Sequence, residues 1–141
     1  MTAILTRPSP STIIHLRKGI SPAILYVDDD ETIRSVHGEV LLRAGYRVDL
    51  AENGEMGWEA LRRKKYNLLI TDHSMSVLSG LDLAVRAREA GLALPIVIVS
   101  SYATFAEDDA YIWLRLSSLR KPFTPAVLLQ TVETVLCAAA P

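Results

Sequence analysis

The sequence has a single cysteine and no excess of charge of either sign, and these shortages exclude several classes of protein. Cys137 has no second cysteine to pair with, so a disulfide-stapled secreted scaffold is excluded. Fifteen Lys and Arg against sixteen Asp and Glu leave a net charge of −1, which gives no overall attraction to nucleic acid or to an anionic membrane. No apolar run approaches the roughly 18 residues of a membrane helix, and the N-terminus lacks the apolar segment of a signal peptide. We therefore expect a cytoplasmic globular protein that binds neither nucleic acid nor membrane.

The chain has room for one domain. It has 141 residues, and half of them are hydrophobic, which is ample for a core. Residues 1–21 differ from the rest, because a Pro/Ser/Thr cluster at 7–12 and a second group of helix breakers at 19–22 interrupt any regular pattern. We expect an N-terminal arm of uncertain order over 1–21 and a single domain over 22–141.

From Ala23 onward, short apolar runs alternate with helical patterns. The runs that we expect to form strands are 23–27, 48–51, 68–70, 96–99 and, as a weaker candidate, 117–119. Helical periodicity covers 31–44, 54–64, 80–90, 104–113 and the residues after Pro125. The first, third and fourth runs are continuously apolar, which is typical of strands covered on both faces. Five β-then-α units predict an α/β fold with a doubly wound, five-stranded parallel sheet.

Polar side chains follow four of the five expected strands. These groups are Asp28-Asp29-Asp30, Thr71-Asp72, Ser100-Ser101 and Lys121-Pro122. Each of them alone is typical of turn chemistry, and Asp30 is well placed to cap the helix that follows it. Together they bring carboxylates, a hydroxyl and an ammonium to the carboxyl edge of the sheet, where ligand sites of such folds lie. Carboxylates packed together repel one another unless a cation joins them, and an oxygen-rich cluster suits Mg²⁺.

At these residues the chain resembles the receiver domain of bacterial two-component response regulators, of the stand-alone, single-domain type. The segments that carry the resemblance are 24–31, 72–80, 95–101 and 121–123. The resemblance implies a flavodoxin-like (βα)5 fold with strand order 2-1-3-4-5, and a cis peptide bond at Lys121-Pro122. It also implies phosphoryl transfer to one aspartate, which is mostly a matter of positioning and charge neutralisation.

The resemblance assigns a role to each residue of the expected site. Asp72 would accept a phosphoryl group from a sensor histidine kinase or a histidine phosphotransfer protein. Ser100 and Lys121 would contact the phosphoryl oxygens. Mg²⁺ would be held by Asp28, Asp29, Asp72 and the backbone carbonyl of Ser74. The protein would then catalyse only its own phosphorylation and dephosphorylation, so we do not expect a further enzymatic activity.

Twenty residues follow Lys121, enough for one helix and no output domain. We therefore expect output through a downstream protein, bound on the face of helix four, strand five and helix five, or through onward phosphotransfer. We expect a monomer or a weak homodimer. Tyr111 is expected on this binding face, whereas Trp113 and Phe105 are expected to fill the core. Tyr102 and Ser74 are expected to flank the path of the hydrolytic water and so to set the lifetime of the phosphorylated state.

Three departures from the family pattern leave alternatives open. Ser76 stands where a proline is common, Ser118 replaces the usual Tyr or Phe three residues before the lysine, and residues 113–116 replace a Gly-containing turn. These changes favour, as the main alternative, a receiver-like interaction module that works without phosphorylation.

Two other interpretations fit the sequence less well. Asp28-x-Asp30-x-Thr32 also matches the nucleophile motif of haloacid-dehalogenase-like phosphatases, but only Glu133 lies downstream of the lysine to serve as their metal-binding acids. A flavodoxin-like mononucleotide binder is rejected, because three aspartates would repel the phosphate.

Overall fold

The computed structural model describes residues 21–101 and 109–139, and these form a parallel sheet with helices on both faces. The strands are β1 (Ala23–Val27), β2 (Arg47–Ala51), β3 (Leu68–Asp72), β4 (Ile96–Ser100) and β5 (Leu116–Arg120). The helices are α2 (Glu31–Arg43), α3 (Gly54–Arg63), α4 (Gly80–Glu89), α5 (Asp109–Leu114) and α6 (Pro125–Ala139). All strand pairs are parallel and the order is β2-β1-β3-β4-β5, which confirms the predicted fold. The expected arm over 1–21 lies, except for Ser21, outside the described residues.

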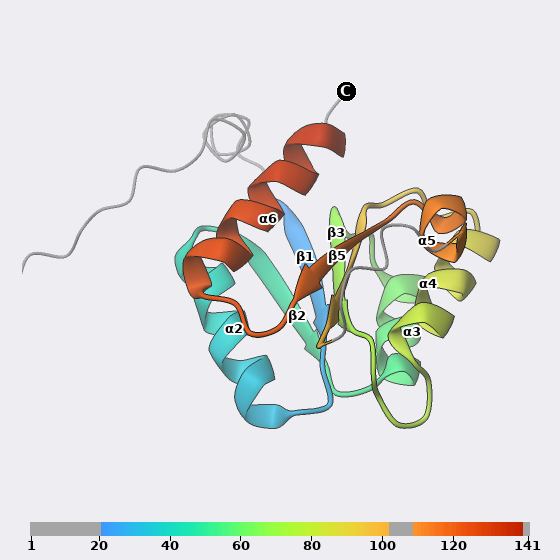
Figure 1. Cartoon of the computed structure of the whole chain (residues 1–141), viewed down its shortest axis with the longest axis horizontal. Helices are drawn as coiled ribbons and strands as arrows, with labels where there is room; N and C mark the ends of the chain where they lie inside the picture. Colours follow the sequence, from blue (N-terminus) through green and yellow to red (C-terminus); the bar gives the residue numbers. More distant parts are fainter. Residues whose placement is uncertain (1–20, 102–108, 140–141) are drawn as a thin grey trace, which may run out of the picture.

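The sheet separates two hydrophobic layers. Figure 1 shows α2 and α6 on one face and α3, α4 and α5 on the other. Every residue of β1, β3 and β4 is buried, as their continuously apolar sequences predicted. Side chains of β1 alternate between the layers, so that Ile24 and Tyr26 pack with Leu41 of α2, and Leu25 and Val27 pack with α3 and α4. This double burial fixes the register of the central strands, and with it the position of the residues that follow them.

The helices begin where the polar residues of the sequence can cap them. The Asp30 side chain accepts a hydrogen bond from the Ile33 N–H, as predicted, and Asn53 and Ser79 cap α3 and α4 in the same way. Each of these caps ends the loop that follows a strand. The chain therefore turns sharply at the carboxyl edge of the sheet, and the residues at strand ends stay at that edge.

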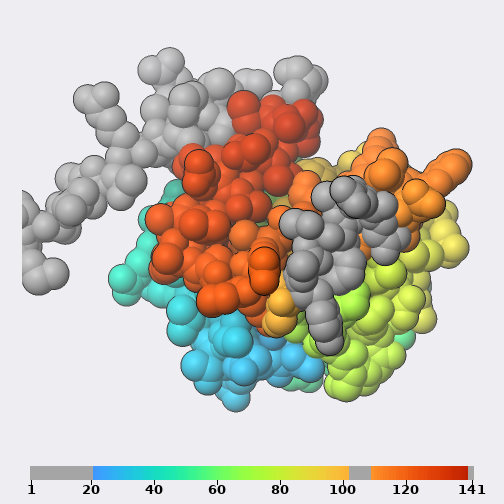
Figure 2. Space-filling model, in the orientation of Figure 1, coloured from blue at the N-terminus to red at the C-terminus, as the bar shows by residue number. Residues whose placement is uncertain are grey.

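The expectation for the aromatic residues of α5 is wrong. Tyr111 is buried, with 3% of its surface exposed, whereas Trp113 is 84% exposed. The two residues are two positions apart, which is about 200° around a helix, so burying one against the sheet turns the other to solvent. In the space-filling view α5 lies at the right-hand edge of the molecule (Figure 2). Phe105 and Tyr102 are outside the described residues.

Candidate functional site

Three carboxylates converge at the carboxyl edge of the sheet. Asp28 and Asp29 follow β1, and Asp72 ends β3, which pairs with β1 in parallel. One oxygen from each carboxylate lies within 4.8 Å of the others. Asp28 and Asp72 are buried, whereas Asp29 is exposed. The pairing of two buried strands therefore creates the acidic cluster from residues that are 44 positions apart.

Lys121 supplies the positive charge that faces this cluster. Its Nζ atom lies 3.0 Å from Oδ1 of Asp72, and the Lys121-Pro122 bond is cis, as the resemblance implied. The Lys121 N–H also donates a 2.8 Å hydrogen bond to the Ser100 carbonyl, which ties the lysine loop to the end of β4. Ser100 is buried at the end of the strand beside β3. The structure thus gathers Asp28, Asp29, Asp72 and Lys121, with Ser100 on the adjacent strand end.

The environment of Asp28 leaves its negative charge poorly compensated. Burial raises the pKa of this carboxyl, the Asp30 N–H offsets part of that rise, and the charge of Asp72 raises it further. The Asp30 N–H reaches Oδ1 at 2.9 Å, but Oδ2 is buried and accepts no hydrogen bond from the part of the chain that the structure describes. A buried oxygen that accepts no hydrogen bond costs free energy, so this oxygen is well suited to serve as a ligand to a cation.

The loop over 73–80 is held close against the acidic cluster. The His73 N–H donates to the Val99 carbonyl at 2.8 Å, and the Gly80 N–H donates to the His73 carbonyl at 3.0 Å. A Cβ atom on Gly80 would overlap the backbone carbonyl of Asp72, so only glycine permits this approach. Ser74 lies in this loop and is exposed. Its proposed contribution of a backbone carbonyl stays a prediction.

Val77 holds a strained conformation in the same loop. Its φ of 75° lies in the left-handed region, which a β-branched residue adopts at a cost of about 1–2 kcal/mol. The Val77 side chain is exposed, so its packing does not offset the cost of this backbone conformation. The turn between Asp72 and α4 therefore imposes this strain on Val77.

We expect Val77→Asn to raise the free energy of unfolding by about 1 kcal/mol, because asparagine tolerates positive φ. Urea unfolding measures the change. Val36→Asn is the matched control, since Val36 is also exposed but lies inside α2, where valine and asparagine have similar propensities. An equal effect of both substitutions would show that the turn at Val77 is not strained.

Beneath the acidic cluster lies an aromatic group that the sequence did not single out. The Tyr26 hydroxyl lies 2.6 Å from Nδ1 of His37, and the His37 ring packs on Phe123 at 4.9 Å between centroids. Burial raises the pKa of Tyr26, and the charges of Asp28 and Asp72 add to the rise. Burial also lowers the pKa of His37, with Lys121 contributing. The sequence feature that could have indicated this group is the helical periodicity that places His37 among apolar residues.

The arrangement of carboxylates and lysine can be compared with known proteins. The sequence matches the response regulator receiver domain over residues 24–133. The chain belongs to this family. It is 36% identical to the chemotaxis protein CheY1 of Helicobacter pylori over 118 residues, which cover 80% of this chain and 95% of that protein. It is 33% identical to the response regulator receiver protein CpdR of Brucella abortus, covering 82% of this chain and 98% of CpdR.

Solved receiver structures share the fold. The chemotaxis regulator CheY4 of Vibrio cholerae superposes with a TM-score of 0.76 at 25% identity, covering 82% of this chain and 98% of that one. The regulator TrrA of Thermotoga maritima, solved with Mg²⁺ and BeF, gives 0.73 at 31% identity, covering 81% of this chain and 98% of that one. A longer relative, the cyclic-nucleotide phosphodiesterase regA of Dictyostelium discoideum, is 31% identical over 92% of this chain, but the match spans only 18% of that enzyme. This receiver domain thus functions in two-component signalling.

No helix within residues 21–101 and 109–139 of this receiver domain is long and apolar enough to cross a bilayer.

Proposed function

We propose that this receiver domain acts as a response regulator that accepts a phosphoryl group on Asp72. The observation that carries the proposal is the Asp72 carboxylate, buried between Lys121 at 3.0 Å and the carboxylates of Asp28 and Asp29. An aspartate with no role in phosphoryl transfer would not need a lysine and two further carboxylates beside it. Phosphoryl transfer needs them, because the incoming group adds negative charge that must be neutralised where it arrives.

In this proposal Asp28, Asp29, Asp72 and the backbone carbonyl of Ser74 hold Mg²⁺. The donor set consists of oxygens, which a hard cation prefers, and Oδ2 of Asp28 has no other partner among the described residues. When bound, Mg²⁺ offsets the charge of the carboxylates and of the phosphoryl group. The residues of the chain supply the remaining contacts.

The transfer step forms one bond and breaks one. A carboxylate oxygen of Asp72 bonds to phosphorus while the bond from phosphorus to the donor imidazole nitrogen of a phosphohistidine breaks. The imidazole leaves with the electron pair of that bond and takes up a proton, and the product is an aspartyl phosphate. Lys121 keeps its charge beside the transferred group, and the Ser100 hydroxyl donates to a phosphoryl oxygen.

We infer that the protein is cytoplasmic and that its output passes to another protein. The binding face consists of α5, β5 and α6, which are the fourth helix, fifth strand and fifth helix of the receiver. Ile112 and Trp113 support this assignment, because both are large, apolar and mostly exposed on α5. An exposed tryptophan is a favoured anchor at protein interfaces. Ser118 is too small to gate a pocket by rotating, so we predict that this surface responds through a shift of Ser100 toward the phosphoryl group.

The proposal is tested by incubating the protein with acetyl phosphate and measuring its intact mass. We expect an adduct of one phosphoryl group with Mg²⁺ present and almost none after the metal is chelated, because the acidic cluster repels the donor without it. No adduct in either condition would favour the alternative, a receiver-like module that binds its partners without phosphorylation. Ser76 and Ser118 favour this alternative, because both depart from the residues that are common in the family.

A further inference from the structure

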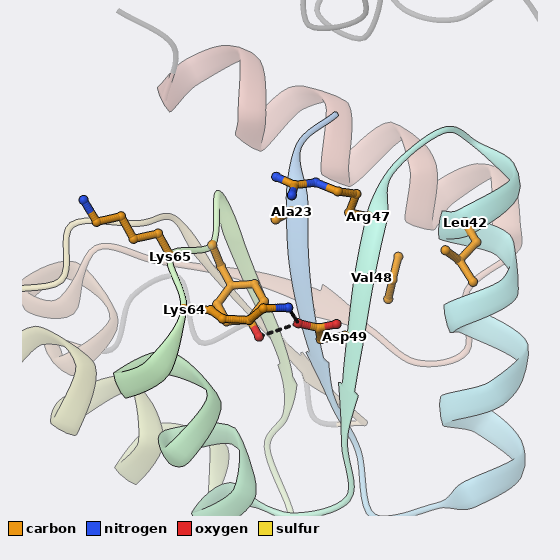
Figure 3. Close-up of a pocket in the computed structure, with 8 residues that line it drawn as sticks. Ala23, Leu42, Arg47, Val48, Asp49, Lys64 and Lys65 are labelled. Carbon is orange, nitrogen blue, oxygen red and sulfur yellow. Dashed lines mark hydrogen bonds and ion pairs between the residues drawn. The ribbon is translucent and has the colours of Figure 1, made fainter. Parts of the chain in front are cut away.

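Positive charge gathers at the amino edge of the sheet, opposite the acidic cluster. Residues 62–65, which read Arg-Arg-Lys-Lys, end α3 and lead toward β3. Arg47 begins β2 at the same edge, which is the upper end of the sheet in Figure 3. All five side chains are exposed. A chain with a net charge of −1 therefore carries a strongly basic region at one end.

Two hollows adjoin this basic run, one on each side of Lys64 and Lys65. The first, of about 320 Å³, is also lined by Arg47, Val48 and Asp49. Figure 3 shows its residues, with Lys65 directed away from the sheet. The second, of about 490 Å³, lies between the end of α3 and the loop over 91–94. Its lining includes Leu61, Leu92 and Leu94, with the basic residues 62–65 beside them. The surface thus combines an apolar floor with a cationic rim.

The charges of this rim are only partly compensated. Asp49 is the one carboxylate among the residues that line the two hollows, against five cations. Its Oδ2 atom accepts from Lys64 at 2.9 Å and from the Tyr66 hydroxyl at 2.6 Å. These two contacts hold the pKa of Asp49 below its usual range, with the Tyr66 hydrogen bond contributing most. The negative charge of Asp49 is therefore already matched by Lys64.

Outside the hollows, one further carboxylate reaches the run. Glu59 lies 2.9 Å from Arg62 and 3.8 Å from Arg63, and all three side chains are about half exposed or more. Within the described part of the chain, neither Lys65 nor Arg47 forms an ion pair. The dipole of α3 accounts for Arg62 and Arg63 in its last turn, but not for the cations beyond the helix.

We propose that this basic edge docks a segment of a partner protein in which acidic and apolar side chains alternate. The apolar floor of the second hollow favours side chains such as leucine, and the cationic rim favours glutamate or aspartate on either side of them. Single-stranded nucleic acid is a poorer match, because it needs aromatic platforms for its bases. Tyr66 is the one aromatic residue that lines the hollows, and its hydroxyl is held by Asp49.

The chain's own N-terminal segment does not match the surface. Residues 1–20 contain Arg7, Arg17 and Lys18 but no Asp or Glu, so the basic rim would repel them. The N-terminal segment is therefore not the occupant of this surface.

The basic edge is separate from the candidate phosphorylation site. The five residues of β3, about 15 Å of extended chain, lie between them, and no residue of the acidic cluster lines either hollow. Docking at this edge is consequently independent of the state of Asp72. The proposal goes beyond the proposed function and does not depend on it.

The test measures the binding of a fluorescein-labelled decapeptide of alternating glutamate and leucine by anisotropy. We expect binding that weakens as salt rises, and amide shifts in the NMR spectrum that are confined to residues 61–66 and 91–94. Arg63→Gln with Lys65→Gln should weaken binding roughly three- to tenfold, since each exposed charge contributes modestly. Arg86→Gln with Arg120→Gln removes the same charge elsewhere and should leave binding unchanged, as should Asp72→Asn.

Three results would overturn the proposal. The first is equal binding of a glutamate–serine decapeptide, which would mean that the apolar floor plays no part. The second is tighter binding of a single-stranded DNA of equal charge, lost in the same double variant, which would make nucleic acid the ligand. The third is an equal loss in both double variants, which would reduce the effect to net charge.

Discussion

Asp72→Asn is expected to abolish the phosphoryl adduct while leaving the fold intact. The amide has the size of the carboxylate but lacks the anionic oxygen that must bond to phosphorus. The residue is buried at the end of β3, where its carboxylate pairs with Lys121 at 3.0 Å, and the amide oxygen of asparagine can still accept a hydrogen bond from that ammonium. The yield of adduct from acetyl phosphate, read by intact mass, should fall to background.

The matched control for this substitution is Asp82→Asn, which makes the same chemical change in an exposed carboxylate of α4 that is not part of the acidic cluster. Its adduct yield should equal that of the unaltered protein. An adduct of undiminished yield in Asp72→Asn would place the acceptor elsewhere. A yield lost in both variants would mean that net charge, and not the acceptor oxygen, limits the reaction.

Arg88→Met is expected to destabilise the fold strongly. The Arg88 guanidinium donates to the carbonyls of Leu114 at 2.7 Å, Leu92 at 2.8 Å and Leu94 at 2.7 Å. Burial lowers its pKa, with Arg115 adding to the effect. Removing the donor leaves three part-buried carbonyls unpaired, and we expect a loss of about 2–4 kcal/mol in the free energy of unfolding.

Urea unfolding of Arg88→Met, with Arg86→Met as the control, measures this loss. Arg86 lies in the same helix but forms a half-exposed pair with Glu55 at 3.2 Å, so its removal should cost less than about 1 kcal/mol. Arg88→Lys should fall between the two, because an ammonium keeps the charge but cannot reach carbonyls in the forked geometry of a guanidinium. Equal losses for Arg88→Met and Arg86→Met would show that the carbonyls find other donors.

Arg88 also explains how the chain manages without a glycine-containing turn before β5. Arg115 adopts a φ of 54° there, a conformation that favours glycine, and it follows directly on Leu114. The guanidinium of Arg88 joins the end of α4, the loop over 92–94 and this turn through their carbonyls. The sequence showed that the usual turn was missing, but the residue that holds its replacement came from 26 positions away.

The sequence alone determined the fold class and the edge at which the site residues meet. Three continuously apolar runs predicted buried parallel strands, and β1, β3 and β4 are wholly buried. Asp28, Asp72 and Lys121 lie at the ends of their strands or directly after them, so the order of the strands was sufficient to bring them together. The cap at Asp30 could be predicted for a similar reason, since a side chain that bonds three residues along the chain needs only local geometry.

Only the tertiary structure decided which side chains of a short helix face inward. Tyr111 and Trp113 are both large and aromatic, and composition does not say which one the sheet will bury. The same holds for the carbonyls that Arg88 binds, for the pairing of Tyr26 with His37, and for the hollows beside Lys64. Each depends on the relative placement of elements distant in sequence, which apolar periodicity does not specify. Periodicity fixes the face that a long helix buries, but six residues of α5 are less than two turns, so packing against the sheet selects the rotation.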